Sequence, residues 1–364
     1  MVSVCCIDVG LGTQDILFFD QSYDYLPKMI LPSATQIFAR KIAKLTHRNL
    51  LITGGIIGGG PITRSVKELI SKGGRVKATL PAALTFSYNL DHVKSMGIEI
   101  IDRISEFEKD FTIVELKEID LKFLLELARR YEICDRLDYI VFAVQDHGKA
   151  PEGVSAIEYR HNLLKSFIEE NPKPISLFFE DRDIPDTLLR MKSVSQQLKS
   201  SISGEPFSGK IYATDTVIAA CVGASLDPNA IGKKRIVTID IGNGHTFASM
   251  LVDGEIVGYF ETHTSTLTPE MLERFVQLFI EGRLTHEQIL REGGHGAYTS
   301  EKCRGPVDAI IVTGPKRDII KRTNLNFQFG NPLNDHMVTG ALGLLYLTNQ
   351  KENLNIGMGW SNRT

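Results

Sequence analysis

Two short segments of the chain each place an aspartate before a pair of glycines. They read Asp8-Val-Gly10-Leu-Gly12-Thr13 and Asp240-Ile-Gly242-Asn243-Gly244-His-Thr246. In both, an apolar run typical of a buried strand ends at the aspartate, and the glycines allow the backbone to turn tightly. Amide groups that face a common point in such a turn bind phosphate oxygens, and the neighbouring carboxylate can hold a hydrated Mg²⁺ ion. Together the segments indicate a phosphate site that uses a divalent cation.

Each segment alone also has a structural explanation. It would then be an ordinary hairpin turn in which glycine supplies a positive φ and a buried aspartate caps backbone amides. The repetition favours the phosphate site, because the same order of strand, glycine turn and strand recurs about 230 residues further along the chain.

The elements that must position these segments alternate along the chain. Short β-branched runs and helical patterns follow one another, which is typical of an α/β protein with a parallel or mixed sheet. The pair Asp253-Gly254 between two such runs predicts a hairpin. We expect strands at 2–9, 16–20, 49–53, 75–79, 98–101, 139–144, 175–179, 236–241, 246–252, 256–262 and 307–312, and helices at 33–46, 62–72, 121–131, 155–169, 185–200, 269–281, 286–291 and 334–348.

Length and charge exclude several classes of protein. The 364 residues suffice for two domains with sizeable cores, and a net charge of -3 offers no basic footprint for nucleic acid. No apolar run approaches the roughly 18 to 20 residues of a membrane-spanning helix. The N-terminus lacks a basic region and carries Asp8 within its apolar stretch, so we interpret it as a first strand and expect a cytoplasmic protein.

The five cysteines predict neither a disulfide framework nor a metal cluster. Their number is odd, no C-x-x-C pair occurs, and most lie in apolar segments. We expect Cys5, Cys6, Cys134 and Cys221 to be buried thiols, and Cys303, in a polar segment, to be the exposed one.

Three further segments extend the pattern of the two glycine turns. Ala213 to Ser225 is rich in small residues, Ala309 to Arg317 is an apolar strand ending in Gly314-Pro315, and Asn331 to Leu345 predicts a last helix. In this order the five elements resemble the two phosphate motifs, two connecting helices and adenosine motif of the actin, sugar kinase and Hsp70 ATPase superfamily.

The resemblance implies a two-lobed actin-like ATPase (ribonuclease H-like) fold of class α/β, with duplicated mixed sheets. Residues 1–230 would form an N-terminal lobe with the first phosphate motif and a central insertion, and 231–364 a C-terminal lobe with the second phosphate and adenosine motifs. The cofactors implied are ATP and Mg²⁺, bound between the lobes. Asp8 and Asp240 would hold the metal and act in catalysis, and the nucleotide would contact Gly10, Gly12, Thr13, Gly242, Asn243, Gly244, Thr246 and Gly314.

The chain departs from the superfamily pattern at Asn243, His245 and Pro315, where many relatives have glycine or threonine. Taken whole, it is similar to an archaeal-type family that has carried the label of pyruvate formate-lyase activating enzyme. Such activases need a C-x-x-x-C-x-x-C cluster motif, and the sequence contains none. The label therefore has no chemical support in the residues.

Other segments leave alternatives open. The run from Gly54 to Gly60 follows a strand and precedes a helix, so it is either a phosphate or substrate loop or a close-packing turn. Asp146 or His147, just past a strand, is a candidate general base, and the alternative is a capping aspartate beside a surface histidine. Asp215 begins a helix, which makes an N-cap role at least as well founded as catalysis. The other histidines show no H-x-x-x-H or H-E-x-x-H spacing, so we predict no metal site built from them.

Three functions compete at this stage. The chain would bind Mg-ATP and hydrolyse it or transfer its γ-phosphoryl group to a small molecule, act as an ATP-driven switch on a partner protein, or be a degenerate nucleotide-binding protein without catalysis. Positioning and charge neutralisation supply most of phosphoryl-transfer catalysis, so two aspartates, Mg²⁺ and backbone amides suffice for the first. The acceptor or partner and the oligomeric state, a homo-oligomer included, remain open, and no membrane partner is expected.

Overall fold

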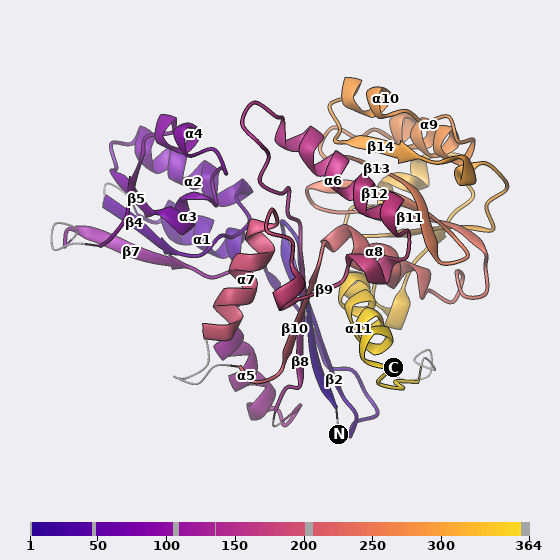
Figure 1. The fold of residues 1–364 in the computed structure, drawn as a ribbon, viewed down its shortest axis with the longest axis horizontal. Helices are drawn as coiled ribbons and strands as arrows, with labels where there is room; N and C mark the ends of the chain where they lie inside the picture. The colour runs from indigo at the N-terminus through magenta and orange to yellow at the C-terminus, as the bar shows by residue number, and fades with distance from the viewer. Residues whose placement is uncertain (1, 46–48, 105–108, 135, 201–206, 358–364) are drawn as a thin grey trace.

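The computed structural model describes residues 2–45, 49–104, 109–134, 136–200 and 207–357, which form three sheets flanked by helices (Figure 1). The strands are β1 (Ser3–Val9), β2 (Thr13–Asp20), β3 (Lys28–Pro32), β4 (Asn49–Gly54), β5 (Val76–Thr79), β6 (Ile98–Ile101), β7 (Phe111–Leu116), β8 (Tyr139–Val144), β9 (Phe179–Glu180), β10 (Lys210–Thr214), β11 (Arg235–Ile241), β12 (His245–Val252), β13 (Glu255–His263), β14 (Gly296–Thr299), β15 (Ala309–Thr313) and β16 (Gln328–Phe329). The α-helices are α1 (Ala34–Ala43), α2 (Gly60–Ser71), α3 (Leu80–Ala83), α4 (Leu90–Ser95), α5 (Leu121–Arg130), α6 (Ala156–Glu170), α7 (Leu189–Ser200), α8 (Thr216–Ser225), α9 (Pro269–Ile280), α10 (His286–Arg291) and α11 (Thr339–Glu352).

The two six-stranded sheets repeat one topology. The first has the order β3-β2-β1-β8-β10-β9 and the second β14-β13-β12-β11-β15-β16. In each, the strand that carries the aspartate as its penultimate residue, β1 or β11, pairs antiparallel with the strand after the glycine turn and parallel with a later strand, β8 or β15. The predicted duplication of mixed sheets is therefore confirmed.

A third sheet is inserted into the first half of the chain. It has four parallel strands in the order β6-β5-β4-β7, and helices α1 to α4 belong to the same part of the sequence. Figure 1 shows this insertion projecting to one side of the central strands, opposite the second half of the chain.

Most of the predicted elements occur within a few residues of their expected bounds, and one is wrong. The apolar run 175–179 is a 3₁₀ turn, Pro174–Leu177, followed by the two-residue β9. Proline has no amide hydrogen for a ladder, so it disfavours a strand at this point. The predicted hairpin at Asp253-Gly254 is confirmed, and both residues have positive φ.

Helices α8 and α11 cross between the two sheets. Figure 1 shows α11 passing beneath α8. The largest cluster of buried apolar side chains includes Val4 and Leu17 of the first sheet, Ile236 and Leu251 of the second, and residues of both helices. Because these helices link the two halves, the division at residue 230 stays a prediction.

The cysteines follow the alternation of the strands. Cys5 and Cys6 are both buried but belong to different core clusters, one on each face of β1. A strand buried on both faces explains the unbroken apolar run at the N-terminus. The prediction for Cys303 is wrong, since this thiol is fully buried and donates to the carbonyl oxygen of Val257 at 3.4 Å. Across the described parts of the chain, none of the helices has the length and apolar character needed to cross a membrane.

The crossing of α8 and α11 has no room for an additional methyl group. A Cβ atom at Gly343 would meet the backbone of Ala219 and Gly223 on the facing helix. We therefore expect Gly343→Ala to lower the free energy of unfolding by about 1 to 3 kcal/mol through overpacking. Alanine at an unhindered helix position stabilises by about 1 kcal/mol over glycine, so the sign of the change is diagnostic.

Denaturant unfolding of the Gly343→Ala variant measures this effect, with Gln350→Ala on the exposed side of the same helix as control. The control should stay within about 0.5 kcal/mol of wild type. A stabilised Gly343→Ala protein would show that the two helices are not in close contact.

Candidate functional site

The segments singled out in the sequence converge on one large cleft. Its volume is ≈ 1190 Å³, and residues from both six-stranded sheets, from the insertion and from the first turns of α8 and α11 line it. The lining residues from the predicted motifs are Asp8, Gly10, Thr13, Asp240, Gly242, Asn243, Gly244 and Gly314. Two predicted contacts, Gly12 and Thr246, are not among the lining residues.

The two glycine turns have the same closure. The Gly10 amide donates to the Thr13 carbonyl oxygen at 2.9 Å, and the Gly242 amide donates to the His245 carbonyl oxygen at 3.0 Å. Neither pair of glycines adopts a positive φ, so the structural explanation based on positive φ is wrong. Absence of a side chain matters instead, because a Cβ at Gly12 would meet the side chain of Asn243. The two turns therefore touch each other.

Asp8 and Asp240 occupy equivalent places in the two sheets. Asp8 lies opposite Asp15 in the pairing of β1 with β2, and Asp240 lies opposite Thr313 in the pairing of β11 with β15. The Thr313 hydroxyl donates to Oδ1 of Asp240 at 3.0 Å, whereas Oδ1 of Asp8 is buried with no hydrogen-bond partner among the described residues. The first turn of α11 lies against the Asp8 carboxylate, since a Cβ at Gly340 would clash with it.

Burial raises the pKa of Asp8, Asp15 and Asp240, and neighbouring carboxylates add to this effect at Asp8 and Asp15. The pKa of Asp8 lies well above its usual value, because of burial first and then the charges of Asp15, Asp240 and Asp215. Burial raises the pKa of Asp15 to about 7 and that of Asp240 to about 6. Acidic groups this close together favour a bound cation. The oxygen ligands, including the unpartnered Oδ1 of Asp8, fit the preference of Mg²⁺.

The backbone at Gly314, in the predicted adenosine motif, accepts only glycine without strain. Its φ is +90°, and a Cβ there would meet the backbone of Ile241 at the end of β11. Thr246, by contrast, is fully buried in β12, and its hydroxyl lies 3.0 Å from that of Thr264. Contact of Thr246 with the nucleotide stays a prediction, and the burial of its side chain does not favour it.

Asp146 is held as a structural carboxylate. It is buried and accepts hydrogen bonds from the Tyr88 hydroxyl at 3.1 Å, the Gly148 amide at 2.9 Å and the Met191 amide in the first turn of α7 at 3.0 Å. It does not line the cleft, whereas its neighbour His147 does. Its role as general base stays a prediction, and its contacts are those of the capping alternative.

Backbone amides of the loop from Gly54 to Gly60 fix it to neighbouring segments through hydrogen bonds. Those of residues 55 to 58 donate to the carbonyl oxygen of Leu116 and to side-chain oxygens of Ser193, Thr85 and Glu118. Residues 56 to 60 all line the cleft, and the loop leads into α2 at Gly60. The close-packing role therefore accounts for most of this run.

A buried ion network joins the two halves beside the cleft. Arg160 of α6 contacts Asp215 at 2.7 Å and Glu261 of β13 at 3.1 Å. Asp215 also caps α8, accepting from the Val217 amide, so its predicted N-cap role is confirmed. Gln145 donates to the other oxygen of Glu261 at 2.6 Å. The positive charge of Arg160 is the main reason that the pKa of Glu261 falls to about 2, against the effect of burial.

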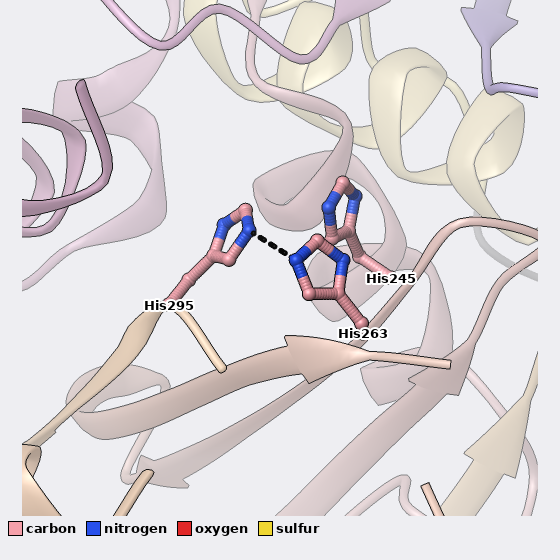
Figure 2. A group of neighbouring side chains, drawn as sticks. All are labelled: His245, His263 and His295. Carbon is pink, nitrogen blue, oxygen red and sulfur yellow. Dashed lines mark hydrogen bonds between the residues drawn. The ribbon is translucent and has the colours of Figure 1, made fainter. Parts of the chain in front are cut away.

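Sequence reasoning missed a cluster of three histidines next to this network. His245, His263 and His295 place one ring nitrogen each within 4.8 Å of the others, and Figure 2 shows their imidazoles gathered together. Local spacing cannot reveal such a group, because the residues come from β12, from β13 and from the segment before β14. The hairpin at 253–254 alone would place His245 opposite Thr262, and a bulge between Met250 and Leu251 shifts the partner to His263.

The duplicated sheets, the two glycine turns and the crossing helices define a two-lobed actin-like ATPase fold. A family profile described as "Putative pyruvate format-lyase activating enzyme (DUF1786)" matches residues 57–319. The chain belongs to this family. A comparison with curated proteins finds no match.

Solved structures with similar folds include three that cover most of the chain. The ethanolamine utilization protein EutJ from Carboxydothermus hydrogenoformans is 11% identical, with 94% of this chain and 89% of that chain covered and a TM-score of 0.31. The inorganic polyphosphate/ATP-glucomannokinase from Arthrobacter sp. strain KM is 12% identical, covering 96% and 100%, with a TM-score of 0.38. The Ppx/GppA phosphatase of Aquifex aeolicus is 11% identical, covering 86% and 68%, with a TM-score of 0.32.

The raised pKa of Asp240 predicts a pH-dependent stability difference. The pKa of Asp240 is raised from its ordinary value of 3.8 to about 6 in the folded protein. The folded protein therefore loses stability as the pH rises from about 4 to 6, because the unfolded chain ionises this group more easily. The free energy of unfolding of Asp240→Asn relative to wild type should therefore rise by about 2 to 3 kcal/mol between pH 4 and pH 7 in metal-free buffer.

Unfolding curves of the variant and of wild type at several pH values measure this difference. Both proteins contain the same histidines, so the effect of histidine titration cancels in the comparison. The control is Asp183→Asn, which replaces an exposed carboxylate outside the cleft. A relative stability of Asp240→Asn that falls with pH would mean that the ionised carboxylate stabilises the fold, as a capping aspartate does.

Proposed function

We propose that the chain binds Mg-ATP in the cleft and transfers the γ-phosphoryl group to a small molecule or to water. The observation that supports this most is the convergence of Asp8 and Asp240, with their two glycine turns, on a single cleft. Each turn alone is an ordinary hairpin. Two equivalent turns in contact, each beside a buried carboxylate, make a site for a polyphosphate and its cation.

Asp8 and Asp240 are the residues that would hold Mg²⁺, directly or through water. The ion supplies neutralisation of phosphate charge when it is bound. Asp15 faces Asp8 across the β1–β2 ladder and also lines the cleft, so it adds negative charge around the same place. Amides in the turns and the first turn of α11 offer the positive ends of backbone dipoles to phosphate oxygens.

The insertion supports transfer to a small molecule over action on a partner protein. It contributes polar residues to the same cleft, among them Thr63, Arg64, Thr85 and Tyr88. A second substrate bound there would lie within the cleft that holds the nucleotide motifs. Of the two candidates for its general base, His147 lines this space and Asp146 does not.

The family description names an activating enzyme. An iron–sulfur activase function is not what we propose. The five cysteines are all buried and free, and the cluster motif is absent from the sequence. Among the described residues, the side chains that come close enough together to hold a metal ion as a group of three are histidines and not cysteines.

Nucleotide binding is the first expected outcome. Mg-ATP at about 100 times its Kd should stabilise the native state by about 2.7 kcal/mol, which appears as a rise in melting temperature. Asp183→Asn should show the same rise as wild type, and Asp8→Asn a smaller one. Absence of a shift at millimolar Mg-ATP with folded wild-type protein would contradict the proposal.

Loss of turnover without loss of the fold is the second expected outcome. Asp8→Asn and Asp240→Asn should lower phosphate or ADP release by about 10²-fold or more, because the charge that holds the cation is gone. Their melting temperatures without metal should match or exceed that of wild type. If the protein transfers the phosphoryl group to a small molecule, ADP release should increase when a suitable acceptor is added. An ATP-driven switch would hydrolyse ATP slowly with or without such an acceptor. Wild-type turnover in both variants would refute the assignment of the two turns.

A further inference from the structure

The three histidines beside the cleft form a second candidate site that the nucleotide motifs do not require. His245 and His263 are cross-strand partners on β12 and β13, and His295 precedes β14, with its amide bonded to the Glu261 carbonyl oxygen at 2.8 Å. His245 and His263 line the cleft. The ring centroids of His295 lie 4.6 Å from those of both other histidines.

We propose that His245, His263 and His295 bind a divalent transition-metal ion, of the kind that imidazole nitrogens prefer, with an open coordination position facing the cleft. Three histidines plus an exchangeable fourth ligand is a common composition for a catalytic zinc site. Nitrogen ligands favour Zn²⁺, Co²⁺ or Ni²⁺ over Mg²⁺, which prefers oxygen. The ion is therefore distinct from the Mg²⁺ proposed at Asp8 and Asp240.

The geometry of the cluster supports this assignment. Nε2 of His263 and Nε2 of His295 share a hydrogen bond of 3.3 Å (Figure 2), and a metal ion would replace the shared hydrogen. A tetrahedral ion with metal–nitrogen bonds of about 2.0 to 2.1 Å separates two ligand nitrogens by about 3.3 to 3.4 Å. One edge of the coordination tetrahedron is thus already present, and the ligand nitrogen of His245 is within 4.8 Å of both.

The residues behind the histidines match the outer shell of a metal site. Nδ1 of His295 has no hydrogen-bond partner among the described residues and lies 3.7 Å from Oε1 of Glu261. A carboxylate on this side favours the tautomer that carries its hydrogen on Nδ1 and leaves the lone pair on Nε2. Glu261 can thus orient the ring of His295 with Nε2 available to a metal ion.

The net charge of the neighbouring ion network also favours a bound cation. Arg160 is a single cation between two carboxylates, Glu261 and Asp215, so the network beneath the histidines keeps one negative charge. A divalent cation bound above an anionic network is electrostatically favoured.

Cobalt binding tests the site without reference to ATP. Co²⁺ titrated into metal-free wild-type protein in excess Mg²⁺ should bind with one ion per chain and give the strong visible absorption of a four-coordinate complex. His263→Ala and His295→Ala should each weaken binding by about 100-fold or more, because loss of an outer-shell partner alone costs 10- to 100-fold. His92→Ala, which removes an exposed histidine of α4, should bind as wild type does.

Two results would overturn the proposal. One is the absence of stoichiometric Co²⁺ binding to folded wild-type protein, and the other is unchanged binding in both cluster variants. Anomalous diffraction from Co²⁺-containing crystals of the wild-type protein avoids any variant that fails to fold. It should place the ion among the three imidazoles, and an ion located only elsewhere would refute the site. Failure here leaves nucleotide binding untouched, since Mg-ATP binding is measured separately.

Discussion

The close crossing of α8 and α11 is the constraint on which the rest of the structure depends. Each six-stranded sheet packs one of its faces against these two helices, which the sheets share. Their backbones meet at Gly223 and Gly343, where a side chain on either would strike the other helix. This contact sets how near the two sheets approach. Because the first turn of α11 abuts Asp8, it also sets where the two glycine turns meet.

Burial of charge near this crossing follows two different patterns. Around Arg160, opposite charges and hydrogen bonds compensate one another, so Glu261 stays ionised. Around Asp8, burial and the like charges of neighbouring carboxylates raise the pKa values of Asp8 and Asp15. Buried carboxylates of like charge are unfavourable unless something else offsets them. We interpret the first pattern as a bridge between the two halves and the second as a site prepared for a ligand.

The sequence predicts the parts of the fold that depend on local pattern. Strand and helix periodicity located most elements. The repeated glycine turns indicated the duplicated sheets and predicted that Asp8 and Asp240 face one cleft, and both residues line it. Features that depend on tertiary contacts were not predictable. The burial of Cys303 depends on its packing against β13, and the hydrogen bonds of Asp146 come from three separate segments.

The histidine cluster illustrates the same limit more sharply. The Asp253-Gly254 turn predicts which strands pair, but a single-residue bulge decides that His245 faces His263. Shifting a strand pairing by one residue changes which side chains share a face. No local signal in the sequence indicates this bulge, and His295 belongs to the segment that precedes β14.

The most direct test of the central claim is a crystal structure with a non-hydrolysable ATP analogue and Mn²⁺ in place of Mg²⁺. Anomalous scattering then locates the ion independently of the nucleotide. Our account predicts a manganese peak between the carboxylates of Asp8 and Asp240, with the phosphates at the two glycine turns. A nucleotide bound outside this cleft, or a manganese ion at neither aspartate, would contradict it.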